Sequence, residues 1–146
     1  MATEVASPVG ITNTPAGCAV LLADPIGEEE RHERGQLGLR AHRRGRNLDR
    51  ALLAGRPFVG KVVYDLTRGI DLLRHHQAID PERIACAGSS LGGTVTQLLA
   101  AVDDRLVACV NSAWAADYRE FDGDTGCCYR LHGLIQDMNQ AELIAM

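Results

Sequence analysis

The stretch from residue 84 to residue 110 constrains the fold most, because two short apolar runs in it flank one amphipathic segment. The first run, IACA at 84–87, enters the glycine-rich turn GSSLGG, and the following TVTQLLAAV carries apolar residues at helical spacing. The second run, LVACV at 106–110, comes after a turn at two aspartates. Two strands joined through a helix pair in parallel, so this stretch predicts a β-α-β unit.

Two earlier segments extend the same alternation. Residues 18–23, CAVLLA, form an apolar run that ends at Asp24-Pro25, which is typical of a strand buried on both faces. A helical stripe follows, with Gly69 as its weak point. The stripe consists of Val59, Val62, Val63, Leu66, Ile70 and Leu73. We therefore predict the α/β class, with a mainly parallel sheet flanked by helices, a loosely ordered lead-in at 1–17 and one domain at 18–146.

The segment from Glu28 to Arg50 interrupts this pattern with dense charge. We interpret it as a solvated, partly helical excursion. A basic phosphate-binding patch is the alternative, but acidic residues are interleaved with the basic ones and no aromatic residues accompany them.

Composition argues against several classes of protein. The formal net charge of -4 gives no electrostatic reason to expect a nucleic-acid partner, and no apolar run approaches the roughly 20 residues that cross a membrane. The N-terminus lacks the basic start and apolar stretch of a secretory signal, so we expect a cytoplasmic protein. The five cysteines are an odd number and indicate small buried thiols, not disulfides. The pair Cys127-Cys128 lacks the further ligands of a zinc site, so no metal is expected.

The turn at 88–92 has the pattern G-x-S-x-G, which only Ser90 satisfies, because centring it on Ser89 would replace the glycines by Ala87 and Leu91. In a nucleophile elbow the serine occupies a strained turn, and the residues two positions away come too close for side chains. We interpret Ser90 as the nucleophile and the backbone N–H of Leu91 as an oxyanion donor at a helix start. A glycine-rich turn without chemistry is the alternative.

The block from residue 64 to residue 112 resembles the centre of α/β-hydrolase esterases, most closely the acetyl xylan esterase and dienelactone-hydrolase-like group. In that group a helix with the pattern D..RAIDYL leads through vDp.RI into G.S.GG, and then through aalD.Ri.a.v into the next strand. The matching residues here are Asp65, Arg68, Ile70, Asp71, Leu72, Asp80, Pro81, Arg83, Ile84, Gly88, Ser90, Gly92, Asp104, Arg105 and Leu106. A weaker similarity extends over roughly residues 18–146.

The resemblance implies a catalytic triad in the order serine, acid, histidine, with no metal or organic cofactor. In the family the acid and histidine follow strands that would begin near Met146, and a second oxyanion donor would precede Cys18, so we expect an incomplete domain. Within the chain, His132 is the best candidate base. Asp117 and Asp122 are candidate acids, and the alternative is that both are solvated loop carboxylates. The other histidines are interpreted as surface residues: His32, His42, His75 and His76.

Two functions follow from this reasoning. The first is a serine carboxylic-ester hydrolase, acting on acetyl or related esters of small molecules or carbohydrates through an acyl-enzyme on Ser90. The second is a truncated, non-catalytic hydrolase fragment that folds only with a partner or self-associates. A small parallel sheet without its flanking strands would expose its edges, and homo-oligomers could form through them.

Overall fold

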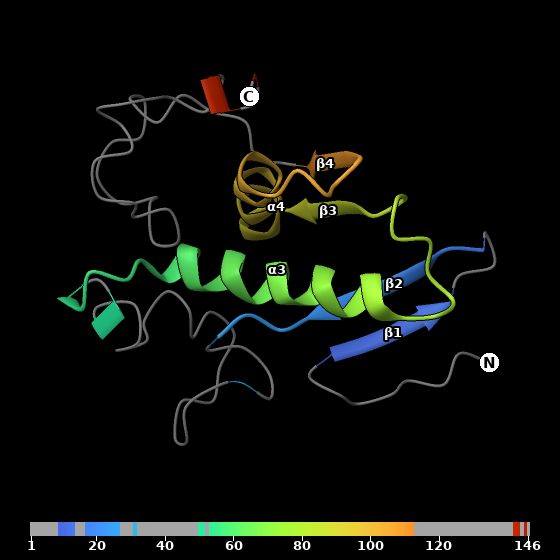
Figure 1. Ribbon diagram of the computed structural model, residues 1–146. Coiled ribbons are helices and arrows are strands. Elements are labelled where there is room, and N and C mark those ends of the chain that lie inside the picture. Colours follow the sequence, from blue (N-terminus) through green and yellow to red (C-terminus); the bar gives the residue numbers. More distant parts are fainter. Residues whose placement is uncertain are drawn as a thin grey trace.

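The computed structural model describes residues 9–13, 17–26, 31, 50–51, 53–112, 142–143 and 145. Its elements in chain order are β1 (Val9–Asn13), β2 (Ala19–Ala23), α3 (Phe58–His75), β3 (Ala85–Ser89), α4 (Leu91–Val102) and β4 (Ala108–Ser112) (Figure 1). Helix α3 lies between the β1–β2 pair and the unit formed by β3, α4 and β4. None of the helices in these ranges is long and apolar enough to span a membrane.

The predicted β-α-β unit is present, and with it the α/β class with a parallel sheet flanked by helices. Strands β3 and β4 pair in parallel, with Ala85 opposite Ala108. Helix α4 covers one face of the pair, where the thiols of Cys86 and Cys109 both donate to the carbonyl oxygen of Thr96, at 3.8 and 3.7 Å. Burial, together with the neighbouring thiol, raises the pKa of Cys86 to about 12, so this thiol is a poor nucleophile.

The described cysteines form no disulfide, but they are less buried than the sequence predicted. Cys18 and Cys109 are exposed, and Cys86 is half-buried. Burial was expected from the apolar runs around them. The structure differs because Cys18 precedes β2, and Cys109 lies in β4, which among the described strands has a neighbour on one side only.

Strand β1, which the sequence analysis did not predict, pairs antiparallel with β2 and places Ile11 opposite Leu21. It lies inside the segment 1–17, where we expected only a loose lead-in. Its sequence, VGITN, is too short to show an alternating pattern. The strand conformation depends on pairing with β2. The prediction that β2 is buried on both faces is wrong, since Leu22 is 63% exposed on the face turned away from α3.

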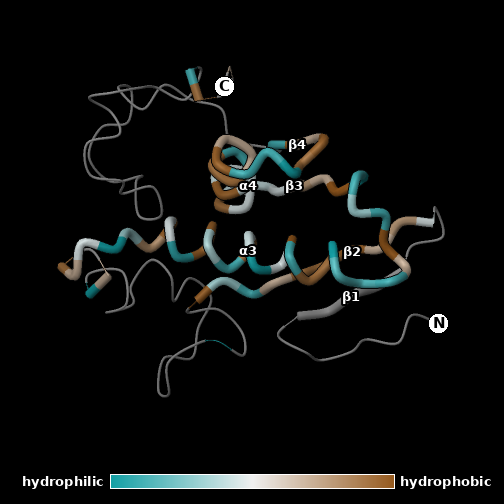
Figure 2. Tube along the Cα trace, in the orientation of Figure 1, coloured by the Kyte–Doolittle hydropathy of each residue, from teal (hydrophilic) through white to brown (hydrophobic). Residues whose placement is uncertain are grey.

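Helix α3 buries the stripe that the sequence predicted. Val59, Val62 and Ile70 are at most 7% exposed and pack against the apolar side of α4, a helix that is hydrophobic along most of its length (Figure 2). Gly69, the expected weak point, faces β2, and a Cβ built there would lie 2.9 Å from Leu21 Cδ2. The missing side chain lets the helix approach the strand closely.

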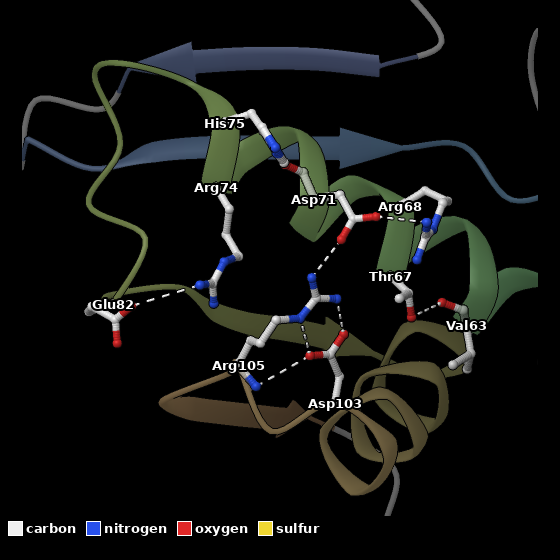
Figure 3. Close-up of polar contacts among 9 residues, drawn as sticks. All are labelled: Val63, Thr67, Arg68, Asp71, Arg74, His75, Glu82, Asp103 and Arg105. Atoms are coloured by element: carbon white, nitrogen blue, oxygen red, sulfur yellow. Dashed lines mark hydrogen bonds and ion pairs between the residues drawn. The ribbon is translucent and has the colours of Figure 1, made fainter.

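Arg105 connects α3 to the end of α4 through two carboxylates (Figure 3). Its Nη1 donates to Asp71 Oδ1 in α3 at 2.5 Å, while Nε and Nη2 donate to the two oxygens of Asp103 at 2.7 and 2.6 Å. The side chain of Asp103 is only 5% exposed, so its negative charge is stabilised by the bidentate pair with Arg105 and not by water. The hydrogen bonds from Arg105 hold the pKa of both carboxyl groups below the ordinary value.

The substitution Arg105→Gln should lower the free energy of unfolding by about 2 kcal/mol at pH 7, because it leaves the Asp103 carboxylate nearly buried without its cation. The matched control is Arg68→Gln. Arg68 is 58% exposed and pairs with Asp71 across one helical turn, so its loss should cost less than about 0.5 kcal/mol. Urea unfolding followed by circular dichroism measures both.

The same ion pair predicts a pH dependence. Because the native carboxyl pKa values are lowered, the stabilisation is present above the ordinary value of 3.8 and is lost as the pH falls through the native values. The deficit of Arg105→Gln against the wild type should therefore shrink below about pH 4. A deficit that stays constant down to pH 2 would show that the carboxylate charges do not contribute to stability.

Candidate active site

Ser90 occupies the junction between β3 and α4, in a backbone conformation that non-glycine residues rarely adopt. Its φ is 54° and its ψ is -119°, and it is the one non-glycine residue with positive φ in the described part of the chain. Such a conformation costs on the order of 1–3 kcal/mol and persists only where the surroundings enforce it. Here the Ser90 N–H donates to the carbonyl oxygen of Ser112 in β4 at 3.1 Å, and the Ser90 carbonyl accepts from the N–H of Thr94 at 3.2 Å.

The residue is also exposed, at the carboxyl end of the parallel pair. Backbone strain at an exposed serine, enforced by two neighbouring elements, is the arrangement that the elbow motif requires. The geometry therefore fits a nucleophile, while the chemical role of Ser90 stays a prediction.

The glycines around Ser90 divide into two kinds. A Cβ on Gly88 would overlap the backbone carbonyl of Gly92 and come within 2.6 Å of Thr96 Oγ1, so the first glycine of the motif is required by close packing. The same expectation is wrong for Gly92, where a Cβ would meet no atom within 4 Å. Gly93 carries the second close contact instead, since a Cβ there would overlap the side chain of Asn111 in β4.

Leu91 is the first residue of α4, so its N–H has no acceptor within the helix. Leu91 directly follows Ser90 in the sequence. The positive end of the helix dipole lies at this N–H and strengthens its attraction for a negative charge. This placement is compatible with the predicted oxyanion donor.

A cavity of about 300 Å³ lies beside the elbow. Apolar residues of four elements form its walls. They are Ala23 at the end of β2 and Pro25 just after it, Val62 and Leu66 of α3, Ala87 of β3, and Leu91 and Val95 of α4. Its polar end is an ion-pair cluster in which Arg31 donates to the carbonyl oxygen of Asp24 and to Asp65 Oδ2, both at 2.8 Å. Lys61 also binds Asp65.

Two cations share the Asp65 carboxylate in this cluster. Burial acts to raise the pKa of Asp65, but the hydrogen bonds from Lys61 and Arg31 outweigh it, so the pKa lies below the ordinary value. Sequence reasoning placed Arg31 in a solvated excursion and missed this contact. No local signal could have revealed it, because Arg31 and Asp65 are 34 positions apart.

The other predicted site residues are not brought to Ser90 by the described structure. Asp117, Asp122 and His132 lie outside the described residues, as do His32 and His42. His75 and His76 are exposed at the end of α3, where His75 Nδ1 lies 2.7 Å from the carbonyl oxygen of Asp71 and His76 Nδ1 accepts from the N–H of Ala78. Both precede β3, whereas Ser90 follows it, so the length of that strand, roughly 16 Å, separates them.

Within the described ranges, no three His, Cys, Asp or Glu side chains are grouped so that they could hold a metal ion. The proposed chemistry at Ser90 needs none.

Comparison with known proteins identifies the family of this chain. Residues 43–142 match the Prolyl oligopeptidase family. Over 67 residues the chain is 33% identical to "Putative hydrolase YtaP" of Bacillus subtilis (strain 168), an alignment that covers 46% of this chain and 22% of that protein. The chain therefore matches about a fifth of the relative's length. No solved structure matches significantly.

The contrast between the two motif glycines is testable. Gly88→Ala should lower the free energy of unfolding by about 3 kcal/mol, because its Cβ meets backbone that cannot move without displacing α4. Gly92→Ala should be neutral or stabilising by up to about 1 kcal/mol, since the site is open and helical. Equal losses in urea unfolding would contradict the packing described here.

Proposed function

Because the chain belongs to the Prolyl oligopeptidase family, within the α/β-hydrolase superfamily, we propose that it is a serine hydrolase acting through Ser90 on carboxylic esters. The superfamily resemblance found in the sequence is thereby confirmed, and hydrolase is the activity class of the family. The finer assignment, to acetyl or related esters of small molecules or carbohydrates, rests on the motif letters of residues 64–112 and remains a prediction.

The observation that carries the proposal is the backbone of Ser90, strained, exposed and fixed at a strand-to-helix junction. In the proposed reaction Ser90 Oγ bonds to the ester carbonyl carbon and its proton passes to a base. The negative oxygen that develops is met by the Leu91 N–H. Collapse expels the alcohol, which takes up the proton, and water then hydrolyses the acyl-serine to the acid and free serine.

The base and the acid of this scheme are proposed from sequence. His132 is the candidate base and Asp117 the candidate acid, and both need to come within hydrogen-bond reach, about 2.6–3.2 Å, of their partners. A neutral histidine accepts the proton, so the proposed base acts in its uncharged form.

A second function is supported by a different observation. The described strands form two separate pairs, so sheet edges stay open, and Val107 and Val110 at β4 are 64% and 60% exposed. These features favour a non-catalytic hydrolase fragment that folds only with a partner or self-associates. Under this alternative, Ser90 has the conformation of a nucleophile but lacks its catalytic partners.

Covalent labelling separates the two functions. A fluorophosphonate probe should modify the wild-type chain at Ser90, and Ser90→Ala should abolish the labelling. The matched control is Ser89→Ala, which removes the neighbouring exposed hydroxyl and should leave labelling within about twofold of wild type. Intact-protein and peptide mass spectrometry locate the adduct. Folded wild-type protein that takes up no probe at Ser90 would exclude the esterase reading for this chain.

A further inference from the structure

Two cysteines lie opposite each other on the paired strands that flank the elbow. Cys86 in β3 and Cys109 in β4 are direct partners in the parallel register. Opposite residues of a sheet point to the same face, which here is the face covered by α4. Both thiols donate to one acceptor of that helix, the carbonyl oxygen of Thr96, at 3.8 and 3.7 Å. The two sulfur atoms are therefore close neighbours between the strands and the helix.

The backbone on both sides of this cysteine pair is held in register. Before it, the Val107 N–H donates to the Ile84 carbonyl oxygen at 2.9 Å. After it, the Ser90 N–H donates to the Ser112 carbonyl oxygen at 3.1 Å. Neighbouring strands lie about 4.8 Å apart, which is inside the range of roughly 4.4–6.8 Å between Cα atoms that a disulfide spans. A bond between the two sulfur atoms thus requires rotation of the side chains and little movement of the strands.

The two thiols differ in their access to solvent. Cys109 is exposed, whereas Cys86 is half-buried. Burial, together with the Cys109 thiol, raises the pKa of Cys86 to about 12, so this group stays protonated at neutral pH. A dissolved oxidant therefore meets Cys109 first. Cys86 is a weak nucleophile, but an oxidised Cys109 would lie directly beside it, so their reaction is intramolecular and favoured by proximity.

We propose that Cys86 and Cys109 form an oxidation site, at which a peroxide converts the two thiols into a disulfide between β3 and β4. First, Cys109 Sγ attacks one oxygen of hydrogen peroxide, the O–O bond breaks, and a sulfenic acid and water form. Then Cys86 Sγ bonds to Cys109 Sγ, the S–O bond breaks, and the hydroxyl leaves with the Cys86 proton as a second water. The thiols lose two electrons, which the peroxide gains. This inference goes beyond the proposed hydrolase function and does not rest on it.

The disulfide closes a covalent loop around the elbow. The loop, residues 86–109, contains Ser90, all of α4 and the turn that leads to β4, so the bond joins the two strands of the β-α-β unit. A cross-link restricts the unfolded chain, and this stabilising effect increases with the length of the loop. The oxidised protein should therefore unfold at a higher denaturant concentration than the reduced protein.

Peptide mapping of the wild-type chain tests the proposal, because trypsin separates the two cysteines from each other and from the rest. Cleavage after arginine places Cys86 in residues 84–105 and Cys109 in residues 106–119, each as the only cysteine of its peptide. After treatment with hydrogen peroxide and digestion without reductant, we expect mass spectrometry to find these two peptides joined, with the loss of one hydrogen from each. Dithiothreitol should separate them again.

Two variants provide a matched comparison. Cys86→Ala should abolish the cross-link and leave Cys109 to accumulate as sulfenic or sulfinic acid. Cys18→Ala removes another exposed cysteine, one outside the register of β1 and β2, and should keep the yield of the cross-link within about twofold of wild type. Peroxide should raise the urea midpoint of the wild type by at least about 0.5 M and leave that of Cys86→Ala unchanged. Far-ultraviolet circular dichroism confirms that both variants fold.

Several outcomes overturn the proposal. It fails if the oxidised wild type yields no joined peptide, if either cysteine is joined to a different one instead, or if Cys109 is oxidised to sulfinic acid while Cys86 stays a thiol. A joined peptide without a rise of the urea midpoint would contradict the stabilising loop around the elbow. None of these measurements depends on phosphonate labelling of Ser90, so the proposed function stands or falls separately.

Discussion

The strained backbone of Ser90 is the constraint on which the centre of the structure depends. Its N–H is bonded to β4 and its carbonyl to the first turn of α4, so one residue joins the strand that precedes it to both elements that follow. The strain, on the order of 1–3 kcal/mol, is offset by pairing of β3 with β4 and by close contact between β3 and α4. That contact is possible because Gly88 presents no side chain to Gly92. The same interactions leave Ser90 exposed at the carboxyl end of the parallel pair.

Helix α3, and not a continuous sheet, connects the two halves of the described structure. It buries Val59 and Val62 against α4, and Gly69 gives it close contact with β2 on the opposite side. Two charged clusters lie along it, one around Asp65 and one around Asp71. Each cluster links α3 to a residue 34 positions away in the sequence. These directional ion pairs therefore fix the position of the helix relative to its neighbours, which non-directional apolar packing does not do. Among the described strands none lies between β2 and β3, and α3 packs against β2 on one side and α4 on the other.

The sequence predicted those structural features that depend on residues close together in the chain. The α3 stripe, the β-α-β unit and the position of Ser90 depend on neighbours within a few residues, and periodicity and glycine spacing predicted them. Strand β1 was missed because it is formed by its pairing with β2, and Arg31 because its partner is distant in sequence. The packing role expected at Gly92 belongs to Gly93, since the path of the backbone decides which Cβ position is filled. The roles of Asp117 and His132 stay predictions, outside the described residues.

The conformation of the elbow depends only on contacts within the β-α-β unit. Its conformation is fixed by bonds between Ser90, Thr94 and Ser112, all within the β-α-β unit, and none of them involves β2. A serine held in this way can be positioned before a base or an acid is, because positioning of the nucleophile and its activation arise from different contacts. The β-α-β unit can therefore keep the geometry of a nucleophile by itself, while proton transfer requires a histidine brought to about 3 Å from the hydroxyl. Preorganisation at Ser90 is thus a property of the local fold, whereas activation of a serine requires a base that no described residue supplies here.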